Sequence, residues 1–132
     1  MAQVIYVAGP YTADTDFKRR ENIKKADEVT ARLWHMGFYA ICPHKITAFY
    51  GGLCDEKVFI EGGLEILRRC DAVVLVEGWE GSGGTIGEIE EAMKLHIPIF
   101  KSVYDLLMGD EINYRRAKFH INRWKNRNKS VC

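Results

Sequence analysis

The sequence predicts an α/β domain with a small doubly wound parallel sheet of about four to five strands and helices on both faces. Short apolar runs alternate four times with longer segments of helical periodicity. These runs are continuous rather than alternating with polar residues, which is typical of strands buried on both faces of a parallel sheet. Right-handed crossovers then favour the strand order 2-1-3-4, as in flavodoxin-like and Rossmann-like sheets.

The first elements are a strand, a helix and a second strand. Residues 3–8 (QVIYVA) form the first strand, because Gly9-Pro10 ends the β-branched run. Residues 21–36 carry apolar side chains near the 3.6-residue period of a helix, and Gly37 ends it. Residues 38–42 return to a continuous apolar run and are predicted to form the second strand.

The middle of the chain repeats this pattern. Residues 43–55 show little periodicity, whereas 58–70 regain helical spacing and lead into the aliphatic strand 72–76. After a glycine cluster, residues 86–93 place apolar side chains on one helical face and glutamates on the other. Residues 97–100 form the fourth predicted strand.

The C-terminal part of the chain differs from the rest in charge. Residues 113–132 contain seven Lys or Arg and no acid, so the other 112 residues hold twelve basic and eighteen acidic side chains. We expect one domain over residues 1–132, with a basic helical segment from about 111 that packs through Ile112, Ile121 and Trp124. Its basic face is open to four interpretations: a solvated surface, a contact with the acidic body, a contact with a neighbouring subunit, or a contact with nucleic acid.

Composition excludes several classes of protein. The 47% of hydrophobic and 28% of charged residues argue against disorder. The longest aliphatic run has five residues, far fewer than the roughly 20 that cross a bilayer, so we expect a cytoplasmic protein without a membrane contact. The four cysteines are too widely spaced for a metal or redox motif and are predicted to be buried free thiols.

Ligands of doubly wound sheets bind beyond the carboxyl ends of the strands, at the point where the strand order reverses. Here the loops at that edge are residues 9–12, 43–44 and 77–84. Candidate substrate contacts in the first two loops are Gly9, Pro10, Tyr11 and His44. Tyr11 equally fits an ordinary turn residue, and His44 equally fits a loop histidine without a chemical role.

The glycine cluster holds five of the twelve glycines between Gly78 and Gly87, but it matches no standard nucleotide loop. Walker A requires a lysine that is absent, and GxGxxG would require glycine at position 86. The segment SGGT opens a helix, where free N–H groups favour an anion such as phosphate. Candidate contacts for that anion are Ser82, Gly83 and Gly84.

Glu88 follows this loop and has two interpretations. Thr85 and Glu88 have capping-box spacing, in which Glu88 would bond back to a backbone N–H of its own helix. Alternatively, Glu88 is a carboxylate available for chemistry, and proximity to the helix N-terminus favours its ionised form. Tyr6 is by default a core aromatic residue, although its position in the first strand places its far end near the ligand edge.

Three segments together resemble the nucleoside 2-deoxyribosyltransferase-like superfamily, within it a small branch similar to nucleoside 5′-monophosphate N-glycosidases. They are VIYVAGPYT (4–12), RRCDAVVLV (68–76) and SGGTIGEIEEA (82–92), and the resemblance covers residues 3–101. It implies a flavodoxin-like fold, a small-molecule nucleotide or nucleoside as substrate, no metal or cofactor, and a homo-oligomer. GGTIGE is also similar, with one residue fewer, to the GGxGTxxE loop of phosphoribohydrolases.

The resemblance also implies residue roles. Glu88 would be the catalytic nucleophile at the anomeric carbon, and Tyr6 would orient it. Ser82, where transferases of the superfamily carry Asp, is similar to members that accept a 5′-monophosphate. The chain departs from the pattern at Gly63, where the superfamily usually carries an Asp that contacts or protonates the base; Asp71 matches the pattern but is interpreted as structural.

These features lead to three functional hypotheses. The first is cleavage or transfer of an N-glycosidic bond through Glu88, either as a deoxynucleotide N-hydrolase or as a deoxyribosyltransferase. The second, motivated by Gly63, is a nucleotide-binding module without turnover. The third is a nucleic-acid contact through the basic residues and aromatics of 113–129.

Overall fold

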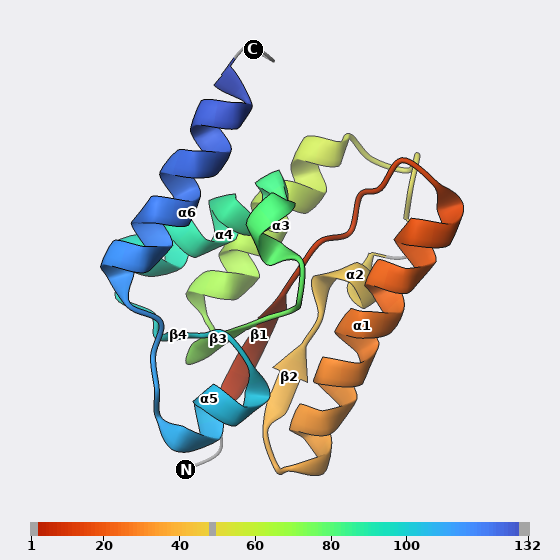
Figure 1. Ribbon diagram of the computed structural model, residues 1–132. Helices are drawn as coiled ribbons and strands as arrows, with labels where there is room; N and C mark the ends of the chain where they lie inside the picture. The colour runs from red at the N-terminus through yellow and green to blue at the C-terminus, as the bar shows by residue number, and fades with distance from the viewer. Residues whose placement is uncertain (1–2, 48–49, 130–132) are drawn as a thin grey trace.

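The computed structural model describes residues 3–47 and 50–129. It contains a four-stranded sheet in the order β2-β1-β3-β4, with every neighbouring pair parallel (Figure 1). The strands are β1 (Val4–Ala8), β2 (Tyr39–Ile41), β3 (Ala72–Leu75) and β4 (Ile99–Phe100). The predicted class, strand number and order are therefore confirmed.

Helices cover both faces of the sheet, as predicted. The helical elements are α1 (Asp16–His35), α2 (Pro43–Ile46), α3 (Glu56–Arg68), the 3₁₀ turn η1 (Trp79–Gly81), α4 (Gly83–Lys94), α5 (Val103–Met108) and α6 (Tyr114–Arg127). One core cluster packs α3, α4 and α6 on one face of the sheet, and the other packs α1 and α5 on the opposite face. The carboxyl ends of the strands carry the loops that lead into α1, α2 and η1 (Figure 1).

The side chains of β1 alternate between these two cores because successive residues of a strand point to opposite faces. Ile5 and Val7 pack in the cluster of α1 and α5, whereas Tyr6 and Ala8 pack in the cluster of α3 and α4. All four are almost completely buried, and each large apolar side chain of this kind stabilises the fold by roughly 1.5–3 kcal/mol. The alternation aims the Tyr6 ring at α3 and α4.

Several element boundaries differ from those predicted. Helix α1 begins at Asp16 rather than residue 21, because Thr15 caps it by accepting a hydrogen bond from Lys18 N. The added turn is polar apart from Phe17, which is exposed, so it carries no apolar period. Strand β4 is two residues shorter at its start than predicted, and α6 begins at Tyr114.

Two short helices were not predicted at all. Helix α2 lies in the segment 43–55 that lacks a pattern, and α5 follows β4. In α5, Ser102 accepts a hydrogen bond from Asp105 N at the start, and Gly109 ends the helix with a φ of 69°. Only Val103 and Leu106 are buried in it, so its apolar signal is too short to be recognised as a period.

The cysteine prediction is partly wrong. Cys42 and Cys70 are buried free thiols as expected, but Cys54 is exposed, and Cys132 lies outside the described residues. Asp71 accepts a hydrogen bond from Val4 N at 2.7 Å, which ties the start of β3 to the start of β1. None of the helices within the described ranges has the length and apolar character that crossing a membrane requires.

Candidate active site

Tyr6 and Glu88 form the centre of the candidate site. The Tyr6 hydroxyl, at the end of a buried side chain of β1, donates a hydrogen bond to Glu88 Oε2 on α4. Tyr6 is 1% exposed, whereas Glu88 keeps part of its surface accessible. The bond joins residues 82 positions apart and holds one carboxylate oxygen towards the sheet.

The capping-box interpretation of Glu88 is wrong in this structure. The cap of α4 is Ser82, whose hydroxyl accepts hydrogen bonds from Thr85 N at 3.3 Å and Thr85 Oγ1 at 3.0 Å. Thr85 therefore lies in the first turn and is buried, while Glu88 lies in the second turn and bonds to Tyr6. Gly83 and Gly84 begin the helix, where backbone N–H groups have no intrahelical acceptor.

The environment of Glu88 favours its neutral form more than the sequence suggested. Burial raises the pKa of Glu88 to about 7, and the hydrogen bond from Tyr6 offsets this only in part. The second turn lies beyond the reach of the helix N-terminal charge, so this charge does not offset the effect of burial on the Glu88 carboxyl. Burial, followed by the nearby Glu88 charge, raises the pKa of Tyr6, so its hydroxyl keeps the proton that it donates.

Gly63 is the third position at this site. A Cβ atom placed on Gly63 of α3 would lie 3.3 Å from the Tyr6 hydroxyl oxygen. The position where the resemblance implies an Asp therefore faces the Tyr6–Glu88 pair. The two flanking carboxylates form ion pairs elsewhere: Glu61 pairs with Lys57, and Glu65 pairs with two arginines at the C-terminal end of α3.

The loop after β1 is held close to β3. Gly9 is buried, and a Cβ atom there would lie 2.5 Å from Val76 Cβ, so the backbone approaches more closely than any side chain allows. His44 Nε2–H donates to Gly9 O at 3.1 Å and lies 3.3 Å from Pro10 O, and its ring packs on Tyr11 at 5.0 Å between centroids. These contacts identify His44 as a residue that fixes this loop.

His44 is also neutral in this environment. Burial lowers the pKa of His44, and its bonds to the two backbone carbonyls offset this shift only in part. Both acceptors are carbonyl oxygens, so the proton of the neutral ring resides on Nε2. The side chain therefore carries no charge with which to contact a phosphate at neutral pH.

Helix α6 supports the glycine loop from outside. A Cβ atom on Gly83 would lie 2.7 Å from Cζ2 of the Trp124 ring, and His120 packs edge-on against Trp79 at 5.2 Å between centroids. Trp124 was predicted to pack, but nothing in the sequence shows that its partner is the first residue of α4. The glycine at position 83 is thus required by a neighbouring side chain, whether or not a ligand also approaches it.

The structure brings the predicted residues together in two groups. Tyr6, Glu88 and the Gly63 position form one group, and Gly9, Pro10, Tyr11 and His44 form the other. The Ser82 hydroxyl oxygen caps α4, although its O–H group can still donate a hydrogen bond. Among residues 3–47 and 50–129, no group of three or more His, Cys, Asp or Glu side chains is arranged to hold a metal ion.

The sheet order and the helices on both faces define a flavodoxin-like α/β fold. The chain belongs to the family described as domain of unknown function DUF4406, whose profile matches residues 3–101. The match ends before α5 and α6. No curated protein matches the chain.

Solved structures with a similar fold include the following two. A conserved protein from Enterococcus faecalis V583 aligns with a TM-score of 0.56 and 22% identity over 75% of this chain, which spans 62% of that protein. A 2-deoxyribosyltransferase from the psychrotolerant bacterium Bacillus psychrosaccharolyticus aligns with a TM-score of 0.54 and 17% identity, covering 83% of this chain and 82% of the other.

Proposed function

We propose that this protein cleaves or transfers the N-glycosidic bond of a nucleotide or nucleoside, with Glu88 as the nucleophile and Tyr6 as its positioning residue. The observation that carries the proposal is the hydrogen bond from the buried Tyr6 hydroxyl to the carboxylate of Glu88, a residue that is half-buried as a whole. It supports the proposal because a nucleophile must be held in one orientation while an oxygen remains free to attack. The fold shared with a 2-deoxyribosyltransferase adds support.

The proposed reaction has two steps. A Glu88 oxygen attacks the anomeric carbon, the bond to the base nitrogen breaks with its electron pair leaving on the base, and a proton from solvent neutralises the base. Attack by water on the anomeric carbon of the resulting glycosyl ester breaks its bond to the Glu88 oxygen, regenerates the carboxylate and releases one proton to solvent, which completes hydrolysis. Attack by a second base gives transfer instead. The ionised fraction of Glu88 therefore limits the first step.

The sugar-phosphate end of the substrate is assigned to the start of α4. Gly83 and Gly84 offer backbone N–H groups there, and Ser82 adds a hydroxyl without negative charge. The second group of residues (Gly9, Pro10, Tyr11 and His44) would then line the neighbouring loop. We also expect a homo-oligomer, which would cover the apolar side chains that α3 exposes at Val58 and Ile60.

The proposal is tested by incubating the protein with a panel of ribo- and deoxyribonucleosides and their 5′-monophosphates, and measuring free base by chromatography. The native chain should release base from at least one of them, and Glu88→Ala should not. Glu90→Ala is a matched control, since it removes a carboxylate of the same helix that pairs with Lys125 instead. Absence of release by the native chain, or equal release by Glu88→Ala, would refute the proposal.

The pH dependence of the reaction gives a second test, through Tyr6→Phe. In the native protein kcat/KM should rise with pH and level off above about 7, as the Glu88 carboxyl ionises. Removing the Tyr6 hydroxyl removes the hydrogen bond that lowers the pKa of Glu88, so the rise should move to higher pH. A reduced rate with an unmoved pH profile would contradict this role for Tyr6.

Gly63 favours one alternative function, a nucleotide-binding module without turnover. At the position facing the Tyr6 hydroxyl the chain has no side chain that could protonate a departing base. Calorimetry with the same panel separates the two functions. Saturable binding without release of base over several hours would favour the binding module.

A further inference from the structure

The outer surface of α6 has features that the proposed glycosidic chemistry does not use. The helix packs on the body through Ala117 and Ile121, which are buried, and through Trp124. On the opposite side Phe119 is 60% exposed. A hollow of about 410 Å³ lies there, formed by side chains of α6 alone: Phe119, Asn122, Arg123, Asn126 and Arg127.

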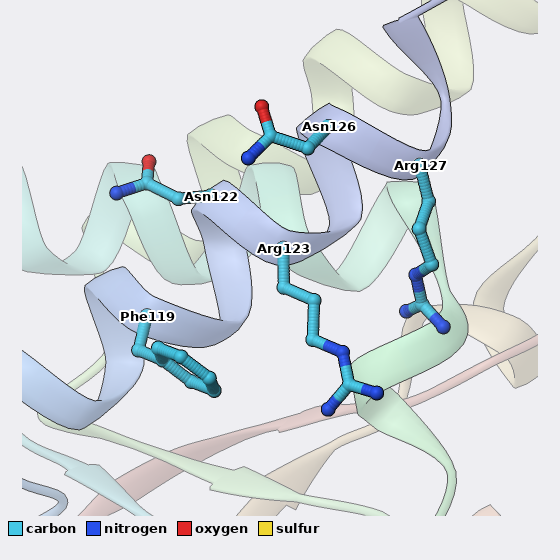
Figure 2. A pocket seen from close by; sticks show the side chains of 5 residues that line it. All are labelled: Phe119, Asn122, Arg123, Asn126 and Arg127. Atoms are coloured by element: carbon cyan, nitrogen blue, oxygen red, sulfur yellow. The ribbon is translucent and has the colours of Figure 1, made fainter.

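The side chains around this hollow form two rows. Figure 2 shows Phe119, Arg123 and Arg127 extending from one side of the helix, and Asn122 and Asn126 from the adjoining side. Residues four apart lie on the same face of a helix about 6 Å apart along its axis. The aromatic ring and the two guanidinium groups therefore form one row along the helix. The two amides form a second row beside it.

A second hollow continues this surface on the side of α4. It has a volume of about 450 Å³, shares Asn122 with the first, and is lined by Lys94, Lys118 and Lys125 together with the Tyr114 ring. The two hollows together hold five lysines or arginines and one carboxylate, Glu90. The surface thus combines a dense positive charge with two aromatic rings.

Intramolecular pairing leaves most of this charge available. Glu90 pairs with Lys125 at 3.2 Å, and within residues 3–47 and 50–129 no other basic residue of α6 forms an ion pair. Besides its apolar contacts, the basic helix is therefore joined to the acidic body by one ion pair among the described residues. In Figure 1 the C-terminal end of α6 extends past the neighbouring helices.

We propose that the outer face of α6 binds single-stranded nucleic acid, independently of the Tyr6–Glu88 site. Guanidinium and ammonium groups would contact the phosphates, and the exposed Phe119 ring would stack on an unpaired base. The Asn122 and Asn126 amides, which both donate and accept, suit the edges of bases. Stacking requires a base whose face is free, so a single strand fits this surface better than a duplex.

The test is fluorescence anisotropy with labelled 20-nucleotide oligo(dT) and oligo(U), titrated with the full chain between 50 and 200 mM NaCl. Binding should weaken as salt increases, since each phosphate contact contributes about 0.7 to the slope of log K against log salt for single strands. Arg123→Ala/Arg127→Ala should reduce that slope by about 1.4. Phe119→Leu should weaken binding by roughly 5- to 140-fold with little change in slope.

A matched control removes equal charge elsewhere. Lys24→Ala/Lys25→Ala takes two exposed lysines from α1, on the opposite face of the sheet, and should leave both affinity and slope nearly unchanged. The four positions changed in the two double variants are all exposed, so circular dichroism should show that both variants are folded. The proposal is overturned by absence of binding at 50 mM NaCl, by equal losses in both double variants, or by tighter binding of a duplex or of polyglutamate than of the single strand.

Discussion

Glu88→Gln is expected to abolish base release and, at the same time, to make the protein more stable above pH 7. Glutamine has nearly the same shape as glutamate and can still accept the Tyr6 hydrogen bond, but its amide does not attack an anomeric carbon. The rate should fall by on the order of 10³-fold or more. The stability effect follows from the ionisation of Glu88 in a partly buried position.

The sign of the stability effect follows from the two pKa values of Glu88. Its folded-state pKa of about 7 lies above its ordinary value of 4.5. The native carboxyl therefore contributes stability that is complete below about 4.5 and lost as pH rises through 7. A neutral glutamine does not undergo this loss. At pH 9 the variant should exceed the native chain by roughly 2–3 kcal/mol in free energy of unfolding, and at pH 4 the two should be similar.

Urea unfolding of both chains at the two pH values measures this difference. Glu90→Gln is the control, because it neutralises a carboxylate of α4 on the side that faces α6. Glu90→Gln should not reproduce the pH-dependent gain in free energy of unfolding. Equal stability of Glu88→Gln and the native chain at pH 9 would show that the folded protein does not disfavour the Glu88 charge, and the expected pH profile of the reaction would then be wrong too.

The sheet could be predicted because its signals are local. Gly9 and Pro10 end β1 immediately after a β-branched run, and β3 is an uninterrupted aliphatic segment. A crossover between parallel strands has a fixed hand, so only a few orders of four such strands remain possible once the strands are recognised. The added first turn of α1 was missed because polar residues carry no period, and a cap at Thr15 is one of several that the sequence allows.

The hydrogen bond between Tyr6 and Glu88 could not be predicted from the spacing of residues in the sequence. Ser82 and Thr85 are both good caps, and the capping-box pattern fits only if the helix begins after Thr85. The first residue of α4 is determined instead by the path of the chain after β3. There Gly78 adopts a φ of 94°, and Trp79 is buried beneath α6. That path depends on packing between segments far apart in sequence.

The glycine contacts around the candidate site also join segments far apart in sequence, so they could not be predicted either. Gly63 faces Tyr6, Gly9 faces Val76, and Gly83 faces Trp124, each across more than 40 residues. A glycine in a sequence indicates that a side chain is not tolerated or not needed, but it does not identify the neighbour. The family resemblance marks position 63 as unusual, and only the fold relates it to the Tyr6 hydroxyl.

Gly9→Ala should destabilise the protein and disrupt the loop beside the candidate site. The added Cβ would meet Val76 Cβ at 2.5 Å and Cγ2 at 2.8 Å, well inside normal contact distance. Val76 has little room to move, because it is 2% exposed and its N–H bonds to Ala8 O at 2.8 Å. Overpacking of this kind costs about 1–3 kcal/mol, which lowers the Tm by roughly 5–10 °C.

Gly62→Ala is the matched substitution for this test. Gly62 lies within α3 with no atom inside 4 Å of the position of its Cβ, so alanine there should stabilise the helix by roughly 0.5–1 kcal/mol. The same chemical change is therefore expected to have opposite signs at two positions, measured by thermal unfolding. Gly9→Ala should also reduce base release, because the Gly9 carbonyl anchors His44. A Gly9→Ala protein as stable as Gly62→Ala would mean that the ends of β1 and β3 do not approach as closely as described.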